Sequence, residues 1–109
     1  MEGKVQELYR KSENSEICME VMRFTENLLR QEHIQMTDAQ KLSLLSHLSA
    51  MVYRSTHKER IEPIDKHLFQ EVSKQSIEMA EKVCNRLTDL HEDEKYLLSI
   101  HFETAKMKG

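Results

Sequence analysis

Six histidines are the most concentrated source of chemistry in this chain of 109 residues. A metal site on one helix favours ligands three or four residues apart. No two of the histidines are that close, and the pairs 47/57, 57/67 and 91/101 are each ten residues apart. A neutral imidazole, whose pKa is about 6.5 in water, can act as a nucleophile at cellular pH. The spacing gives no support to a metal site on one helix and leaves nucleophilic chemistry as the more specific hypothesis.

His47 and His101 differ from the other histidines by their positions. His101 takes the place of a hydrophobic residue in an apolar stripe near the C-terminus, so a helix there would direct its imidazole toward a packed surface. His47 lies on the flank of a leucine stripe, and Arg54 follows seven residues, or two helical turns, later. Because helical side chains lean toward the N-terminus, we expect the guanidinium near the imidazole, where it would suit a phosphoryl group.

The remaining histidines, His33, His57, His67 and His91, fall near predicted helix ends or in polar stretches. We expect all four to lie at the solvated surface. Glu94 belongs to an acidic segment that precedes an apolar run, so it is expected first as a carboxylate at the start of a helix.

Helical periodicity organises most of the chain. Apolar residues recur at three- and four-residue steps in five segments, which predicts an all-α, compact five-helix bundle. The predicted helices cover about 15–33, 37–55, 63–72, 77–87 and 91–105, within a single domain over residues 13–109. Residues 1–12 are charged and are expected to form a short helix or a tail. Thr37 and Gln40 have the spacing of a capping box, and Pro63 suits the first turn of the third helix.

Composition and charge exclude several classes of protein. The only glycines are Gly3 and Gly109, which argues against an all-β fold, a dinucleotide-binding fold and a glycine-rich phosphate loop. The net charge of -3 is spread without a basic stripe, so direct binding of nucleic acid is not expected. No apolar run approaches the roughly 20 residues that span a membrane. The polar N-terminus resembles no signal peptide, and Cys18 and Cys84 fit small core residues in a reducing cytoplasm.

The segments around His47 and His101 resemble the two histidine motifs of the PTS regulation domain (PRD). This domain is a module of bacterial regulators controlled by the sugar phosphotransferase system (PTS). Residues 42–54 are similar to the first motif, which ends in an arginine seven residues after the histidine. Residues 94–102 are similar to the second motif, a glutamate followed by an apolar run and a histidine. Between them, residues 62–64 and 79–82 fit the family's Asn-Pro-Leu and Ala-Glu positions, so the resemblance covers about 13–107.

The resemblance implies a five-helix bundle that commonly dimerises with the motif histidines near the interface. It implies that His47 and His101 are phosphoacceptors, with the phosphocarrier HPr or a PTS EIIB component as donor. Arg54 becomes a phosphate-binding or structural partner, and Glu94 a conformational or capping residue. Ser46 stands where the family usually has aspartate before the first histidine, which favours His101 over His47 as an acceptor.

The sequence therefore predicts a stand-alone, cytoplasmic regulatory module, dimeric and without a cofactor, rather than an enzyme. Phosphorylation on histidine would tune the expression of sugar-utilisation genes or the activity of a partner protein. Two alternatives stay open at this point. The chain could be a structural or adaptor bundle without phosphoryl transfer, or a small metal-binding protein. A metal site would use His57, His67, His91 or the two motif histidines across helices.

Overall fold

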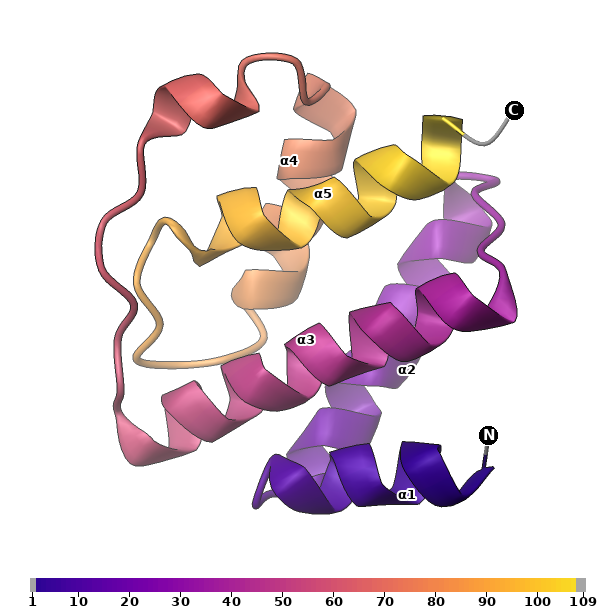
Figure 1. The fold of residues 1–109 in the computed structure, drawn as a ribbon, viewed down its shortest axis with the longest axis vertical. Coiled ribbons are helices and arrows are strands. Elements are labelled where there is room, and N and C mark those ends of the chain that lie inside the picture. Colours follow the sequence, from indigo (N-terminus) through magenta and orange to yellow (C-terminus); the bar gives the residue numbers. More distant parts are fainter. Residues whose placement is uncertain (1, 108–109) are drawn as a thin grey trace.

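The structure, a computed structural model, describes residues 2–107, which form helices and no strand (Figure 1). The α-helices are α1 (Glu2–Lys11), α2 (Ser15–Gln31), α3 (Asp38–His57), α4 (Lys74–Cys84) and α5 (Glu94–Met107), and η1 (Lys66–Phe69) is a single 3-10 turn. The predicted all-α class and the number of five α-helices are confirmed. Among the described residues, no helix is long and apolar enough to cross a membrane.

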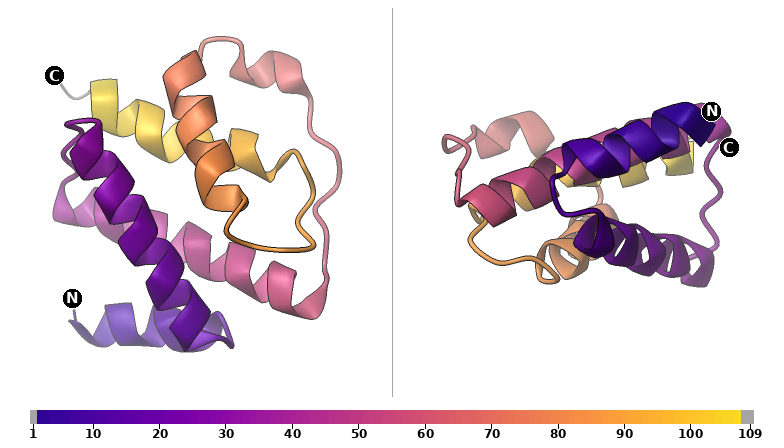
Figure 2. Two further views of the ribbon diagram at one scale, coloured as in Figure 1. Left: turned by 180° about the vertical axis from the view of Figure 1, so that it is seen from behind. Right: turned by 90° about the horizontal axis from the view of Figure 1, so that it is seen from below.

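The helices form two layers. α1, α3 and α5 lie in one layer, and α2 and α4 cover it from behind (Figure 2). α3 and α5 lie side by side and run in opposite directions (Figure 1), while α1 packs on α3 and α4 packs on α5. The arrangement places α3 in contact with α1, α2 and α5, so this helix is the centre of the bundle.

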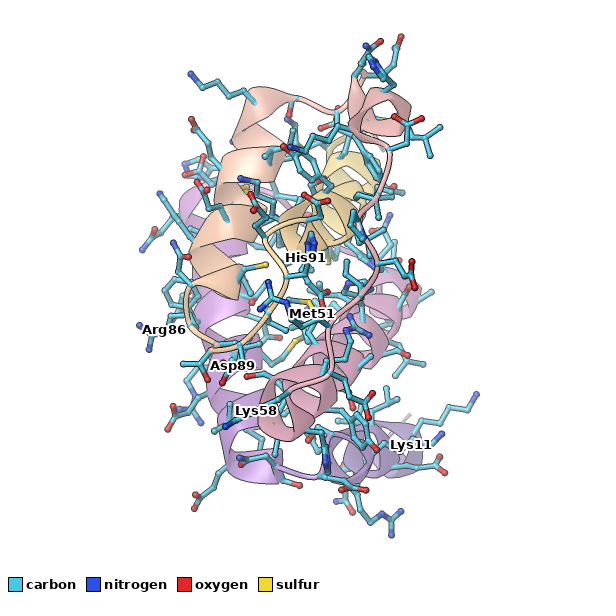
Figure 3. The ribbon with its side chains drawn as sticks, turned by 90° about the vertical axis from the view of Figure 1, so that its left-hand side faces the viewer. Lys11, Met51, Lys58, Arg86, Asp89 and His91 are labelled. Carbon is cyan, nitrogen blue, oxygen red and sulfur yellow. The ribbon has the colours of Figure 1, made fainter. Side chains whose placement is uncertain are left out.

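The hydrophobic core lies between the two layers. The sequence predicts a core stripe of Leu42, Leu45, Leu48 and Val52 in α3; the last three are buried and Leu42 is half-buried. Leu44 and Met51 add a second buried row. Met51 lies in the interior of the molecule (Figure 3). The apolar side chains with no exposed surface come from four helices; they are Cys18, Leu44, Leu48, Met51, Val52, Ala80, Val83, Leu98 and Phe102. Burial of this apolar surface is the main source of stability of the bundle.

Side-chain caps and left-handed residues set the helix ends. The predicted capping box is present: Thr37 accepts from the backbone N–H of Gln40, whose side chain accepts from Thr37. In the absence of internal glycine, four other residue types occupy the left-handed conformation in turns. These residues are Glu13, His33, Lys58 and Asp89, with φ between 57° and 60°. Lys58 and Asp89 are labelled in Figure 3. A side chain disfavours this conformation, so these turns are locally strained.

The prediction of a third helix over about 63–72 is wrong. Pro63 lies in an irregular segment, and η1 is the one helical turn in this stretch. The backbone N–H of Ile64 donates to Oδ2 of the buried Asp93 at 3.1 Å, which ties the segment to the start of α5. Leu68, one of the apolar residues whose spacing suggested this helix, is 76% exposed. In this segment the backbone N–H of Ile64 therefore bonds to a side chain near the start of α5 and not within a helix.

The N-terminal segment, predicted as a short helix or a tail, is the regular helix α1. Its apolar residues Val5, Leu8 and Tyr9 pack against the core. The hydroxyl of Ser49 in α3 donates to the carbonyl oxygen of Leu8 at 2.6 Å, which fixes α1 against α3. α1 is therefore part of the layer that carries the candidate site.

Candidate functional site

The two histidines singled out by the sequence lie in contact. His47 projects from α3 and His101 from α5, and their ring centroids are 5.1 Å apart with an angle of 55° between the ring planes. α3 and α5 run antiparallel (Figure 1), and the contact arises because each carries its histidine on the face toward the other helix. Two positions 54 residues apart in the sequence thus form one site.

Both rings line an open groove of about 840 Å³ between α1, α3 and α5. α3 supplies mainly alanine and serine side chains to the groove, together with Leu42 and His47, and α1 supplies Leu8 and three charged side chains. The lining residues are Lys4, Glu7, Leu8, Lys11, Ala39, Leu42, Ser43, Ser46, His47, Ala50 and His101. The groove opens to solvent beside the histidine pair.

Burial keeps both imidazoles neutral. The pKa of His47 is lowered from 6.5 to about 4, chiefly because burial penalises the charged ring, with smaller contributions from His101 and the Arg54 cation. Burial also lowers the pKa of His101. Nε2 of His47 is buried and has no hydrogen-bond partner among residues 2–107. At neutral pH both rings therefore retain a lone pair that can act as a nucleophile.

The Arg54 guanidinium bonds to Glu94 instead of pointing at His47 as the sequence had suggested. Nε donates to Oε2 at 2.7 Å and Nη2 donates to Oε1 at 2.8 Å, a bidentate pair between α3 and α5. The Glu94 side chain is fully buried, and that of Arg54 is 21% exposed. The Nε and Nη2 donors of Arg54 are thus occupied by Glu94. Glu94 is the first residue of α5 and fastens that helix to α3.

The register of these contacts contains a signal that the sequence analysis missed. His47 and Arg54 are seven residues apart on α3, and Glu94 and His101 are seven residues apart on α5. Equal spacing on two antiparallel helices brings histidine to histidine and arginine to glutamate. The charged residues that α1 adds to the groove had no comparable signal, because residues 1–12 were predicted only as a short helix or a tail.

The remaining histidines lie apart from this site. His33, His57 and His67 are exposed as predicted, and His57 is bonded to Glu13 at 2.9 Å. The surface prediction for His91 is wrong: its side chain is 18% exposed, and its Nδ1 accepts from the backbone N–H of Asp93 at 2.9 Å. Residues 2–107 contain no group of three or more histidine, cysteine or acidic side chains that could hold a metal ion.

A separate polar cluster fastens α5 to the start of α4. Oε1 of Glu103 accepts hydrogen bonds from the hydroxyls of Ser73 and Ser76 at 2.8 and 2.7 Å, and Lys106 donates to Ser73 at 2.6 Å. The two serine hydroxyls, together with the Ser73 N–H and Lys106, lower the pKa of Glu103 to about 2. All these groups are partnered, so the cluster is a structural contact.

The family model described as PRD domain matches residues 22–105 of the chain. A crystal structure of a PRD-containing transcription regulator from Lactobacillus casei ATCC 334 is similar over the whole fold. The two share 32% sequence identity with a TM-score of 0.90, and the match covers 98% of this chain and 96% of that one. No curated protein matches the chain.

Proposed function

Because the chain belongs to the PRD domain family, which is involved in PTS-regulated control of transcription, we propose that it is a regulatory module phosphorylated on histidine. PRD domains are generally regulated by PTS components, and the proposed donor is HPr or an EIIB component. The observation that carries the proposal is the contact of His47 and His101 at the edge of a groove that is open to solvent.

The proposed step transfers one phosphoryl group between side chains. The lone pair of a neutral imidazole nitrogen attacks the donor's phosphorus, a new N–P bond forms, and the bond between phosphorus and the donor side chain breaks with its electrons. The acceptor ring gives up the proton of its other nitrogen, the departing donor side chain takes up a proton, and the phosphoryl group passes from donor to acceptor with no other reactant. The lowered pKa values of both rings support this step, because protonation would remove the attacking lone pair.

His101 is the better placed of the two candidate acceptors. Nε2 of His47 is buried against protein atoms, so a phosphoryl group has no path to it without a movement of the helices. His101 also lines the groove. Within residues 2–107, it has no buried side-chain nitrogen that lacks a hydrogen-bond partner. His47 stays a candidate through its other ring nitrogen.

Phosphorylation would switch the module by adding charge to a packed seam. A phosphoryl group adds close to two negative charges and several acceptor oxygens. Next to two half-buried imidazoles, such a group needs new partners or a displacement of neighbouring surfaces. We propose that the module works in the cytoplasm and as a homodimer. The 44% exposure of Ile100, next to His101 in the sequence, supports the homodimer.

The alternative function is a structural or adaptor bundle without phosphoryl transfer. The burial of His47 and the tilted contact of the two rings favour it, since packed histidines at a helix contact have the same geometry. Both functions are compatible with a PRD fold, and only a phosphorylation assay separates them.

The test is labelling by enzyme I, HPr and phosphoenolpyruvate, with an EIIB component as a second donor. Wild type is expected to acquire acid-labile phosphate, His101→Ala to lose most of it, and His47→Ala/His101→Ala to lose all of it. His57→Ala is the matched control, because His57 lies outside the groove. Absence of label on wild type from both donors, or equal labelling of the double variant, would contradict the proposal.

A further inference from the structure

We propose that Lys4 and Lys11 of α1 form the anion-binding wall of the groove and hold the oxygens of a phosphoryl group carried on His101 or His47. The ligand is a phosphoryl dianion. The inference rests on the proposed function for the identity of the phosphorylated residue, but the wall itself is assigned from geometry. It gives α1 a function beyond packing.

The placement of the two lysines follows from helical spacing. Lys4, Leu8 and Lys11 recur at four and three residues and line the groove together. Leu8 is anchored between them by the hydrogen bond from Ser49 to its carbonyl oxygen and by packing on the core. Lys4 and Lys11 therefore lie two turns apart on either side of a fixed point; Lys11 is labelled in Figure 3.

Among the described residues that line the groove, no cation other than Lys4 and Lys11 is present. Arg54, the cation that the sequence placed beside His47, has its Nε and Nη2 donors bonded to Glu94. The only lysine or arginine side chains that line the groove are Lys4 and Lys11, and neither forms an ion pair with any residue in 2–107. A phosphoryl group on either ring therefore has these two ammonium groups as its available charged partners.

Glu7 allows the direction of the electrostatic effect on labelling to be tested within the same groove. It is the one carboxylate among the lining residues and lies on α1 between the two lysines in sequence. Its negative charge opposes a phosphoryl dianion, whereas the lysines favour one. Removing Glu7 and removing the lysines must therefore have opposite effects. The family match begins at residue 22, so it covers none of these three residues.

The experiment measures labelling by phosphoramidate, a small donor that needs no partner protein. Its P–N bond breaks with release of ammonia while an imidazole N–P bond forms. The rate of histidine labelling is compared for wild type, Lys4→Gln/Lys11→Gln, Glu7→Gln and the control Lys74→Gln/Lys82→Gln. The control removes two exposed lysines of α4, which lie outside the groove. Circular dichroism verifies that each variant is folded.

The lysine variant is expected to label about three- to tenfold more slowly than wild type, and Glu7→Gln about twofold faster, with the control unchanged. The differences should shrink between about 0.01 M and about 1 M salt, because the Debye length falls from about 30 to about 3 Å. A merely structural role of α1 would not respond to salt in this way. Equal rates for the lysine variant and wild type, or no histidine labelling of wild type, would overturn the inference.

The two proposals can fail separately. Labelling of wild type by phosphoramidate but by neither PTS donor would contradict the proposed function and leave the wall to be decided by the lysine variants. Labelling by HPr with equal rates for the lysine variant and wild type from phosphoramidate would contradict the wall alone.

Discussion

α3 and α5 make two polar contacts two turns apart, and the two contacts differ in how fully their groups are partnered. At one, Arg54 and Glu94 form two charged hydrogen bonds of 2.7 and 2.8 Å. At the other, His47 and His101 meet at 5.1 Å between ring centroids, and Nε2 of His47 has no partner within residues 2–107. The same pair of helices thus carries one saturated contact and one with unused bonding capacity.

The difference separates groups that hold the fold from groups available for chemistry. A buried polar atom without a partner costs stability, and such atoms are rare in folded proteins. A sequence that only stabilised this helix contact would place apolar residues at 47 and 101. The histidine pair is therefore the place where the molecule gives up stability, and the ion pair two turns away secures the same contact.

The largest expected effect comes from breaking the saturated contact. Arg54→Met leaves the fully buried Glu94 carboxylate without its partner, and we expect a loss of about 3–5 kcal/mol in the free energy of unfolding. Urea denaturation measures the loss. Arg54→Met/Glu94→Leu removes both charges and should recover most of the stability. A single variant as stable as wild type would show that the ion pair does not fasten the two helices.

The next effect is a pH dependence at the unsaturated contact. The pKa of His47 is about 4 in the folded protein and 6.5 in the reference state, so the unfolded chain binds the proton more readily. The effect of His47 on the free energy of unfolding is therefore constant above pH 6.5. As the pH falls from 6.5 to 4, the free energy of unfolding decreases by about 3 kcal/mol. His101 adds a loss of the same sign. Urea denaturation at a series of pH values gives the free energy of unfolding as a function of pH. This free energy should fall less steeply with decreasing pH for His47→Leu than for wild type, and an equally steep fall would refute the assignment.

A smaller effect of opposite sign is expected from the same residue at neutral pH. His47→Leu removes the buried nitrogen that lacks a partner and keeps a side chain of similar size. The variant should gain about 1–2 kcal/mol over wild type in urea denaturation at pH 7. Ser46→Ala, one residue earlier and exposed, is the control and should change little. A destabilised His47→Leu would mean that the ring is needed for packing.

The smallest effect is expected at the third polar contact of α5. Glu103→Gln weakens the bonds to Ser73 and Ser76 at a side chain that is 21% exposed, where water can replace them. We expect a loss of about 0.5–1 kcal/mol at pH 7 in thermal or urea unfolding. The pKa of Glu103 is lowered to about 2. The stabilisation that its ionised carboxylate gives to the folded state is therefore present above pH 4.5 and is lost between pH 4.5 and 2. If Glu103→Gln lowered the free energy of unfolding as much as Arg54→Met, burial of the carboxylate would not explain why one contact matters more than the other.

The sequence predicted the fold class and the helices with strong periodicity, because an apolar stripe at helical spacing has few other solutions. The capping box at Thr37 is a local pattern and was predicted for the same reason. The third helix was predicted wrongly because the bond from Ile64 to Asp93 joins residues 29 positions apart and leaves no local trace.

The candidate site was predicted in part. His101 was assigned to a position facing a packed surface and His47 to the flank of a leucine stripe, and the structure places both at the contact of α3 and α5. The direction of the Arg54 side chain was not predicted, because competition between Glu94 and His47 depends on the crossing of two helices. The contribution of α1 depends on how a weakly apolar segment docks, which only the tertiary structure decides.

The ion pair of Arg54 and Glu94 also limits how α3 and α5 can move. Sliding α5 along α3 by one turn, about 5.4 Å, would break both of its bonds, whereas tilting α5 about this point would preserve them. The ion pair is in this sense a pivot near the start of α5. A tilt about it moves the far end of α5 most, and through Glu103 and Lys106 that end takes the beginning of α4 with it.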